Sequence, residues 1–178
     1  IQKEGRRQTL YIVQEYIAGL DLDTFAQKHR FSKDEIWQLT EQCLDVLVYL
    51  QDVSPPIVHR DIKPQNIILR ESDRNPVLID FGSVRDALRD PEIGDSTFAG
   101  TFGYMAPEQL FGHTDCRTDL YSLGAVVLTL LTRKDPLELL DPNQTFQWKK
   151  YTNVSSKYSQ FLEKLFHYDP KHRFENAR

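Results

Sequence analysis

The sequence has few cysteines and no pattern that would support a disulfide or a structural metal site. Its two cysteines, Cys43 and Cys116, belong to no C-x-x-C pair and have no histidines nearby in a zinc-binding spacing. A disulfide framework and a structural zinc site are therefore not supported. The chain also lacks internal repeats and low-complexity segments, which argues against repeat and fibrous architectures.

Long hydrophobic runs and a surplus of positive charge are missing too. No uncharged stretch approaches the roughly 20 apolar residues that a membrane helix needs. The formal net charge is −4, whereas a dedicated nucleic-acid binder normally carries a basic excess. We therefore expect no membrane segment in this chain, no nucleic-acid partner and a cytoplasmic location. What is present, 178 residues of which 40% are hydrophobic and 27% charged, is typical of a globular domain.

The hydrophobic pattern predicts a mainly helical α+β fold. Apolar, β-branched and aromatic residues indicate short strands at 10–17, 57–58, 67–69 and 77–79, the first of them ending in a turn at Ala18-Gly19. Helices are expected at 23–28, after Ser32, at 119–131 and at 155–166. Ser32 and Glu35 have the spacing of a capping box. The apolar face of the helix that follows comprises Ile36, Leu39, Cys43, Leu47 and Leu50. A loop is expected at 85–96.

Side chains suited to phosphate chemistry lie between the predicted strands. In the stretch HRDIKPQN, residues 59–66, Asp61 offers a carboxylate, Lys63 an ammonium and Asn66 a carboxamide. These groups are suited to orienting a hydroxyl, neutralising a phosphate and ligating a hard cation, respectively. Asp80 directly follows an apolar run and precedes Phe81-Gly82. It is a second candidate ligand for Mg²⁺, placed where a glycine allows the backbone to turn sharply.

Three motifs in this order resemble the large lobe of a eukaryotic-type (Hanks-type) serine/threonine protein kinase. HRDIKPQN is similar to the catalytic loop of that family, DFG at 80–82 to its metal-binding motif, and APE at 106–108 to the end of its activation segment. The resemblance implies a protein kinase-like C-terminal lobe, α+β and mainly helical, with the N-terminal lobe largely absent. It assigns residues 1–18 to the end of the small lobe and the hinge, and 19–178 to a large lobe truncated at its last helix.

The resemblance also implies catalytic roles, with ATP and Mg²⁺ as cofactors and serine or threonine side chains of proteins as substrates. Asp61 would orient the attacking hydroxyl and Lys63 would stabilise the transferring phosphoryl group. Asn66 and Asp80 would hold Mg²⁺. Thr101 matches the family threonine that bonds to both the aspartate and the lysine, and Lys63 favours serine/threonine over tyrosine specificity. Contacts to the adenine and ribose are expected from the hinge and its surroundings, namely Glu15, Tyr16, Ile17, Asp21 and Ile68.

Other matching residues would have structural roles. Glu108 is expected to form a buried ion pair with Arg173, which closes the activation segment on the lobe. Asp119, taken as the start of the central helix, is expected to brace the backbone of the catalytic loop. His59 and Phe81 resemble the stacked pair of the family's regulatory spine.

Regulatory residues are expected in the segment between the DFG and APE motifs. Thr97, four residues before Thr101, and its neighbour Ser96 are candidate phosphorylation sites. Arg60 and Arg85 would form charge-assisted hydrogen bonds with the phosphate, which would order the segment.

Three interpretations remain open at this point, because no glycine-rich phosphate loop, VAIK-like lysine or partner glutamate occurs before residue 10. In the first interpretation, the chain is a fragment of an active serine/threonine kinase and is inactive or weak without the missing N-terminal lobe as its partner. Alternatively, it is a small-lobe-less homologue that acts as a binding or scaffold module. A third interpretation, a small-molecule phosphotransferase of the aminoglycoside or choline type, is disfavoured by Lys63 and the APE motif. The segment 132–154, which has no long helix, suggests the bacterial branch of the kinases.

Overall fold

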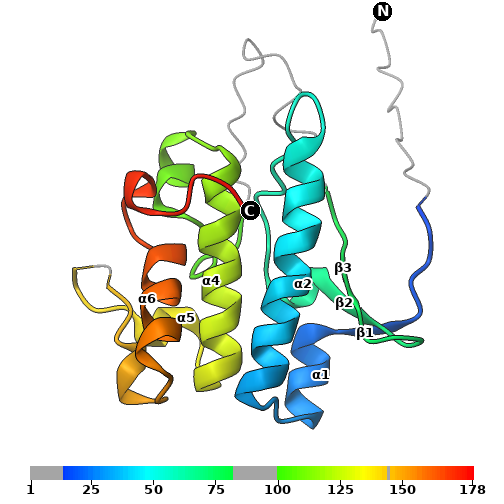
Figure 1. The fold of residues 1–178 in the computed structure, drawn as a ribbon, viewed down its shortest axis with the longest axis horizontal. Coiled ribbons are helices and arrows are strands. Elements are labelled where there is room, and N and C mark those ends of the chain that lie inside the picture. The colour runs from blue at the N-terminus through cyan, green and yellow to red at the C-terminus, as the bar shows by residue number, and fades with distance from the viewer. Residues whose placement is uncertain (1–13, 82–99, 144) are drawn as a thin grey trace, which may run out of the picture.

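The computed structural model describes residues 14–81, 100–143 and 145–178 (Figure 1). Its elements follow in the order β1 (Gly19–Asp21), α1 (Leu22–Lys28), α2 (Lys33–Asp52), η1 (Pro64–Asn66), β2 (Ile67–Arg70), β3 (Pro76–Leu78), η2 (Pro107–Phe111), α4 (Cys116–Thr132), α5 (Pro136–Leu139), η3 (Trp148–Lys150), α6 (Ser156–Leu165) and η4 (Pro170–His172), where η denotes a 3₁₀ turn. The mainly helical α+β class is confirmed. None of the described helices has the length and apolar character needed to cross a membrane.

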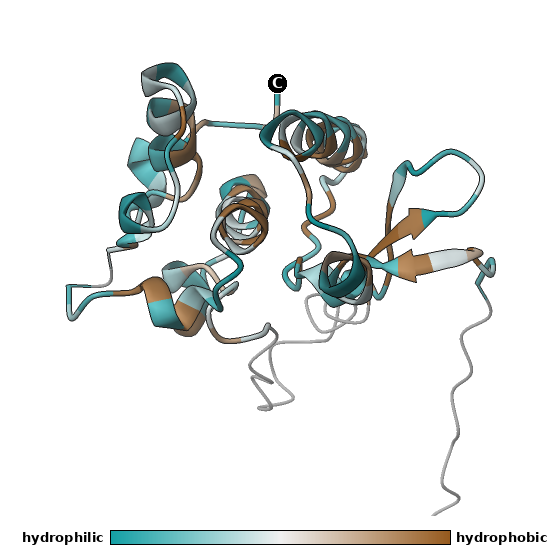
Figure 2. Ribbon diagram, turned by 90° about the horizontal axis from the view of Figure 1, so that it is seen from below, coloured by the Kyte–Doolittle hydropathy of each residue, from teal (hydrophilic) through white to brown (hydrophobic). Residues whose placement is uncertain are grey.

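The hydrophobic core surrounds α4. This helix is buried on nearly all sides and packs against α2 on one side and α6 on the other (Figure 1). In Figure 2, α4 is hydrophobic over most of its surface, whereas α2 has one hydrophobic and one hydrophilic side. The residues predicted for the apolar face of α2 are all buried, namely Ile36, Leu39, Cys43, Leu47 and Leu50. Full burial of one aliphatic side chain contributes about 1.5–3 kcal/mol to the stability of the fold. The packing of this face of α2 against α4 therefore stabilises the domain.

The helix starts are set by capping side chains. The predicted capping box begins α2, since Ser32 Oγ accepts a hydrogen bond from the amide of Glu35 at 3.2 Å and Glu35 Oε2 accepts one from the amide of Ser32 at 2.7 Å. The start of α4 differs from the prediction. The helix begins at Cys116, because the carboxylate of Asp115 accepts from the amide of Arg117 at 2.8 Å and caps it. Asp119 therefore lies inside the helix.

The first strand of the sheet lies later in the sequence than the predicted strand at 10–17. The described part of that segment, residues 14–17, is not in a strand, and β1 instead lies at Gly19–Asp21, where a turn was expected. The antiparallel order is β1-β2-β3, with Gly19 opposite Arg70. A Cβ atom at position 19 would lie 2.2 Å from the carbonyl oxygen of Leu69. Glycine thus permits the close approach of β1 to β2, which a turn assignment overlooks.

The three other strand predictions have different outcomes. Residues 57–58 are not in a strand, and the amide of Ile57 instead donates to the carbonyl of Leu50 at 3.0 Å, which ties this segment to the end of α2. The strands predicted at 67–69 and 77–79 are present as β2 and β3. Between α4 and α6 the described residues form only the short α5 and η3, as expected for a segment without a long helix.

Candidate active site

Four of the predicted catalytic side chains form one hydrogen-bonded network. Asp61 Oδ1 accepts from the hydroxyl of Thr101 at 3.1 Å, and Asp61 Oδ2 accepts from Asn66 Nδ2 at 3.0 Å. Lys63 Nζ lies 3.0 Å from Asp61 Oδ2 and donates to Thr101 Oγ1 at 2.8 Å. Both carboxylate oxygens are therefore held in place by residues from two separate segments of the chain.

The network has a consistent assignment of donors and acceptors. Lys63 is only a donor, so the Thr101 hydroxyl accepts from it and donates its own hydrogen to Asp61. The side chains of Lys63 and Asp61 remain 22% and 17% exposed. A carboxylate that is fixed in direction but still accessible can accept a hydrogen bond from an incoming hydroxyl.

The backbone of the catalytic loop is held by a buried carboxylate. Asp119 Oδ2 accepts from the amide of His59 at 2.8 Å and Asp119 Oδ1 from the amide of Arg60 at 2.9 Å. Burial raises the pKa of Asp119, an effect that the two amides partly offset. Arg60 adopts a left-handed conformation with φ of 71°, which costs about 1–3 kcal/mol for a non-glycine residue. Its carbonyl accepts from Gln109 Nε2 at 2.9 Å, so three hydrogen bonds hold this strained turn.

Asn66 and Asp80 provide a donor set that suits Mg²⁺. Asn66 Nδ2 donates hydrogen bonds to Asp61, and Asn66 Oδ1 accepts none from the described residues, so this oxygen has no competing partner among them. The amide of Ile79 donates to the carbonyl of Asn66 at 3.0 Å, so the next residue, Asp80, lies near Asn66 in the fold. One carboxylate and one amide oxygen match a cation that keeps several waters and binds substrate phosphates. Within the described residues, no cluster of three or more His, Cys, Asp or Glu side chains offers an alternative site.

The expected contact between His59 and Phe81 is present. The two rings lie 4.6 Å apart between centroids, inclined at 60°. His59 is fully buried, and its Nε2 lies 3.0 Å from the carbonyl oxygen of Ile79. The imidazole thus links the catalytic loop to the residues around Asp80.

The ion pair predicted between Glu108 and Arg173 is also present. Arg173 donates to Glu108 Oε1 at 2.6 Å and to Oε2 at 2.8 Å, and its side chain is completely buried. The hydroxyl of Thr118 on α4 donates to the same Oε1 at 3.2 Å. Two segments far apart in the sequence are thereby joined to the central helix.

All five N–H groups of Arg173 donate hydrogen bonds. Besides the two bonds to the carboxylate, it donates to the carbonyls of Arg117 and Tyr168, each at 3.0 Å, and to that of His167 at 2.6 Å. The guanidinium also lies over the ring of Tyr121, 4.9 Å from its centroid. Burial raises the pKa of Tyr121 to about 12, and the positive charge of Arg173 acts in the opposite direction.

The residues expected on the nucleotide side are only partly brought together. Asp21 and Ile68 are opposite each other in the register of β1 and β2. The Asp21 carboxylate caps α1, since it accepts from the amide and the hydroxyl of Thr24 at 2.8 and 2.7 Å. Glu15 is exposed and Ile17 half-buried. Tyr16 is 88% exposed, which excludes a core position for it in this structure.

Three predicted regulatory residues, Arg85, Ser96 and Thr97, lie outside the described residues. The fourth, Arg60, has a buried Nε atom with no hydrogen-bond partner in the part of the chain that the structure describes.

Two residues that support the site had no signal in the sequence motifs. Gln109 joins the APE segment to the catalytic loop, because its Oε1 accepts from the amide of Ala106 at 2.9 Å while its Nε2 donates to the carbonyl of Arg60. Thr118 is fully buried against Glu108. The Asp115 cap could have been found, since an Asp shortly before a long apolar run is typical of a helix start.

The motifs, their spacing and the geometry described above agree with comparisons to known proteins. The protein kinase domain model matches residues 2–177, and the chain belongs to this family. It is 38% identical over 175 residues to the serine/threonine-protein kinase D of Synechocystis sp., covering 94% of this chain and 34% of that protein. It is also 38% identical over 177 residues to PknA, a serine/threonine-protein kinase of Nostoc sp., covering 94% of this chain and 31% of that protein.

These relatives support the bacterial branch of the Hanks-type kinases and argue against a small-molecule phosphotransferase. The chain spans about a third of the length of these curated relatives. Among solved structures, the PknI kinase domain of Mycobacterium tuberculosis is similar with a TM-score of 0.68 and 21% sequence identity, covering 92% of this chain and 60% of that one. This likeness shows the kinase fold.

Proposed function

We propose that this domain transfers the γ-phosphoryl group of Mg·ATP to serine and threonine hydroxyls of proteins. The observation that carries the proposal is the network of Asp61, Lys63, Asn66 and Thr101, in which Thr101 and Asn66 hold the Asp61 carboxylate and the Lys63 ammonium lies beside it. Such positioning and charge stabilisation are what phosphoryl transfer requires from a protein.

Each side chain has one task in this proposal. Asp61 orients the substrate hydroxyl and accepts its proton, and Thr101 keeps the carboxylate turned toward that hydroxyl. Lys63 neutralises charge on the transferring phosphoryl group. Asn66 and Asp80 would hold Mg²⁺, which supplies charge neutralisation at the phosphates when it is bound.

The nucleotide site in this proposal includes Asp21 and Ile68, which face each other across β1 and β2. The segment 15–17 would contact the adenine, and two of its residues, Glu15 and Tyr16, are exposed. The boundary between hinge and large lobe at residue 18, a cytoplasmic location and the absence of a nucleic-acid partner stay predictions.

We also propose that phosphorylation of Thr97 or Ser96 activates the domain. The support is the buried Nε of Arg60, which has no hydrogen-bond partner among the described residues. A phosphate carries a charge of about −1.5 to −2 and forms strong bonds to arginine. Mass spectrometry of active protein should find phosphate on Thr97 or Ser96, and Thr97→Ala should lower activity. Full activity without phosphate on either residue would contradict this.

The function is tested by assaying the 178-residue chain and the full protein encoded by its gene with Mg·ATP and a generic protein substrate. Label from [γ-³²P]ATP should appear on phosphoserine and phosphothreonine with the full protein, and weakly or not at all with the 178-residue chain. If neither form, shown by circular dichroism to be folded, transfers phosphate, the proposal is wrong and a binding or scaffold role is favoured instead.

A further inference from the structure

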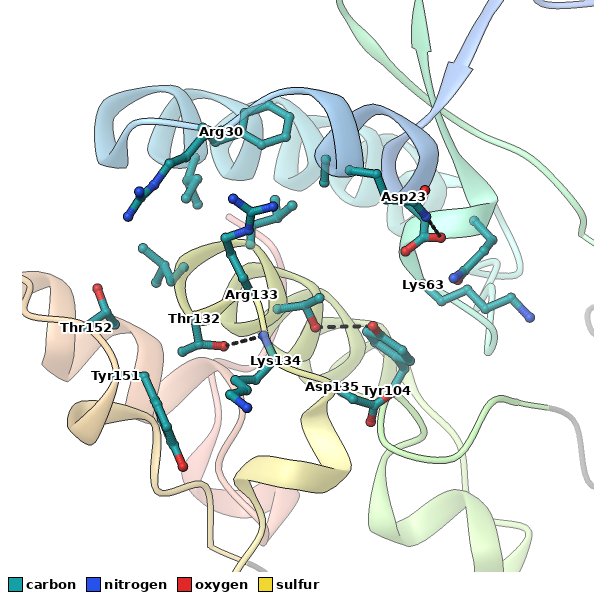
Figure 3. Close-up of a pocket in the computed structure, with 18 of the residues that line it drawn as sticks. Asp23, Arg30, Lys63, Tyr104, Thr132, Arg133, Lys134, Asp135, Tyr151 and Thr152 are labelled. Carbon is teal, nitrogen blue, oxygen red and sulfur yellow. Dashed lines mark hydrogen bonds between the residues drawn. The ribbon is translucent and has the colours of Figure 1, made fainter.

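A cavity of about 850 Å³ opens next to the catalytic network and extends away from it. Lys63, Asn66 and Thr101 line one end. The rest lies between the α1–α2 connection and the C-terminal end of α4, and it reaches Tyr151 and Thr152 (Figure 3). A polypeptide whose hydroxyl reaches Asp61 can therefore place neighbouring side chains in this cavity.

The charge of the cavity is opposite to that of the whole chain. Besides Lys63, it is lined by four cationic residues, Arg30, Lys33, Arg133 and Lys134, and by two acidic ones, Asp23 and Asp135. The chain as a whole has a formal net charge of −4. A concave surface of one sign, on a protein of the other sign, concentrates ligands of complementary charge.

The two arginines differ from the other charged residues of the cavity in having no ion-pair or hydrogen-bond partner in the part of the chain that the structure describes. Neither Arg30 nor Arg133 forms an ion pair with any other residue that the structure describes, whereas Lys134 pairs with Glu138 at 2.8 Å. Figure 3 shows Arg30 extending from the α1–α2 connection and Arg133 from the end of α4, into the same space. Two guanidinium groups are thus available from opposite sides.

The acidic side chains and the remaining lysine of the outer cavity are already engaged. Asp23 accepts from Gln27 Nε2 at 3.2 Å, and Asp135 caps α5 by accepting from the amide of Leu137 at 2.8 Å. The ammonium of Lys33 donates to the carbonyl of Asn153. Among the charged side chains of the outer cavity, those without a hydrogen-bond or ion-pair partner among the described residues are therefore the two arginines.

We infer that this cavity binds acidic side chains of the protein substrate, and that Arg30 and Arg133 determine this specificity. Guanidinium groups form paired hydrogen bonds with carboxylates in a fixed geometry, which favours aspartate and glutamate over neutral residues. The inference rests on the proposed kinase function, since it describes the residues that flank the phosphorylated serine or threonine. It names a substrate class that the catalytic residues alone do not specify.

The test compares two serine peptides that differ only in having glutamate or glutamine around the acceptor. With the full protein, we expect a higher kcat/KM for the glutamate peptide. Arg30→Ala and Arg133→Asn should each lower that value by about 2–5-fold, as expected for a partly solvated ion pair, and leave the glutamine peptide unaffected. Asn is chosen at position 133 because φ is 56° there, a left-handed conformation that asparagine tolerates.

Control variants and a binding measurement separate the possible failures. Lys171→Ala removes an exposed positive charge outside the cavity, so kcat/KM should stay the same for both peptides. Arg30→Lys should retain part of the preference for the glutamate peptide. The preference should also weaken at high salt. Equal kcat/KM values for both peptides in the wild type would overturn the inference and leave the kinase function standing.

Binding of a fluorescent glutamate peptide with alanine at the acceptor position is measured in parallel by anisotropy. If no peptide is phosphorylated but this binding is lost in Arg30→Ala and Arg133→Asn, the kinase proposal fails and the acidic-peptide site stands. If neither variant affects binding, the site assignment is wrong.

Discussion

Replacement of Arg173 by alanine should destabilise the domain more than any surface change. The substitution leaves the Glu108 carboxylate, which is 13% exposed, without its countercharge, and it leaves three backbone carbonyls without their donor. Breaking a buried ion pair from one side costs about 3–5 kcal/mol. For a protein of this size that corresponds to a fall in the melting temperature of about 6–20 °C.

The measurement is equilibrium unfolding in urea, followed by tryptophan fluorescence and repeated as a thermal scan. Arg173→Lys should be less damaging than Arg173→Ala, because lysine keeps the charge but offers three donors in place of five. Arg70→Ala serves as the matched control. It also breaks a doubly hydrogen-bonded pair, with Asp73 at 2.6 and 2.9 Å, but one that is exposed, so little change is expected.

A loss of less than about 1 kcal/mol for Arg173→Ala, the level of a surface pair, would refute this reasoning. It would mean that water enters the site or that the surrounding carbonyls find other donors. A double substitution with Glu108→Gln provides a further check, since two residues in direct contact should be strongly non-additive.

Three further predictions follow from single contacts. Asp119→Asn should lower the urea midpoint, since an amide nitrogen must face one of the two backbone N–H groups that the carboxylate binds, at a cost of about 1–3 kcal/mol; an unchanged midpoint would contradict the bracing role. Thr101→Ala should reduce kcat by more than Thr101→Ser does, because serine keeps the hydroxyl between Lys63 and Asp61; equal rates for the two variants would show that the hydroxyl is not used. Gly124→Ala should destabilise the domain by about 1–3 kcal/mol, measured in the same urea assay, because the new Cβ would lie 2.8 Å from that of Phe166; a fully stable variant would show that α4 and α6 separate easily.

Much of the helical framework could be predicted from the sequence because it depends on local rules. The α2 helix begins at a capping box and buries a face that repeats every three or four residues. Both signals lie within one segment. The β1 strand could not be found in this way, because it depends on Gly19 coming close to Leu69, and this long-range contact has no signature in the local sequence.

The candidate site shows the same division. The residues Asp61, Lys63 and Asn66 lie in one short motif, so their proximity was expected. The contribution of Gln109 and the convergence of Arg30 with Arg133 result from packing between distant segments. Neither follows any spacing rule in the sequence. The support of the catalytic loop and the positive charge of the cavity could therefore be recognised only from the structure.

The central claim is tested most directly by the rate of phosphate transfer from Mg·ATP to a serine/threonine peptide by the full protein and its Asp61→Asn variant. Asparagine keeps the shape of the side chain but cannot accept the proton, so kcat should fall by about 10²–10⁴-fold, while circular dichroism and the urea midpoint stay close to those of the wild type. A folded Asp61→Asn variant that transfers phosphate at the wild-type rate would contradict the account.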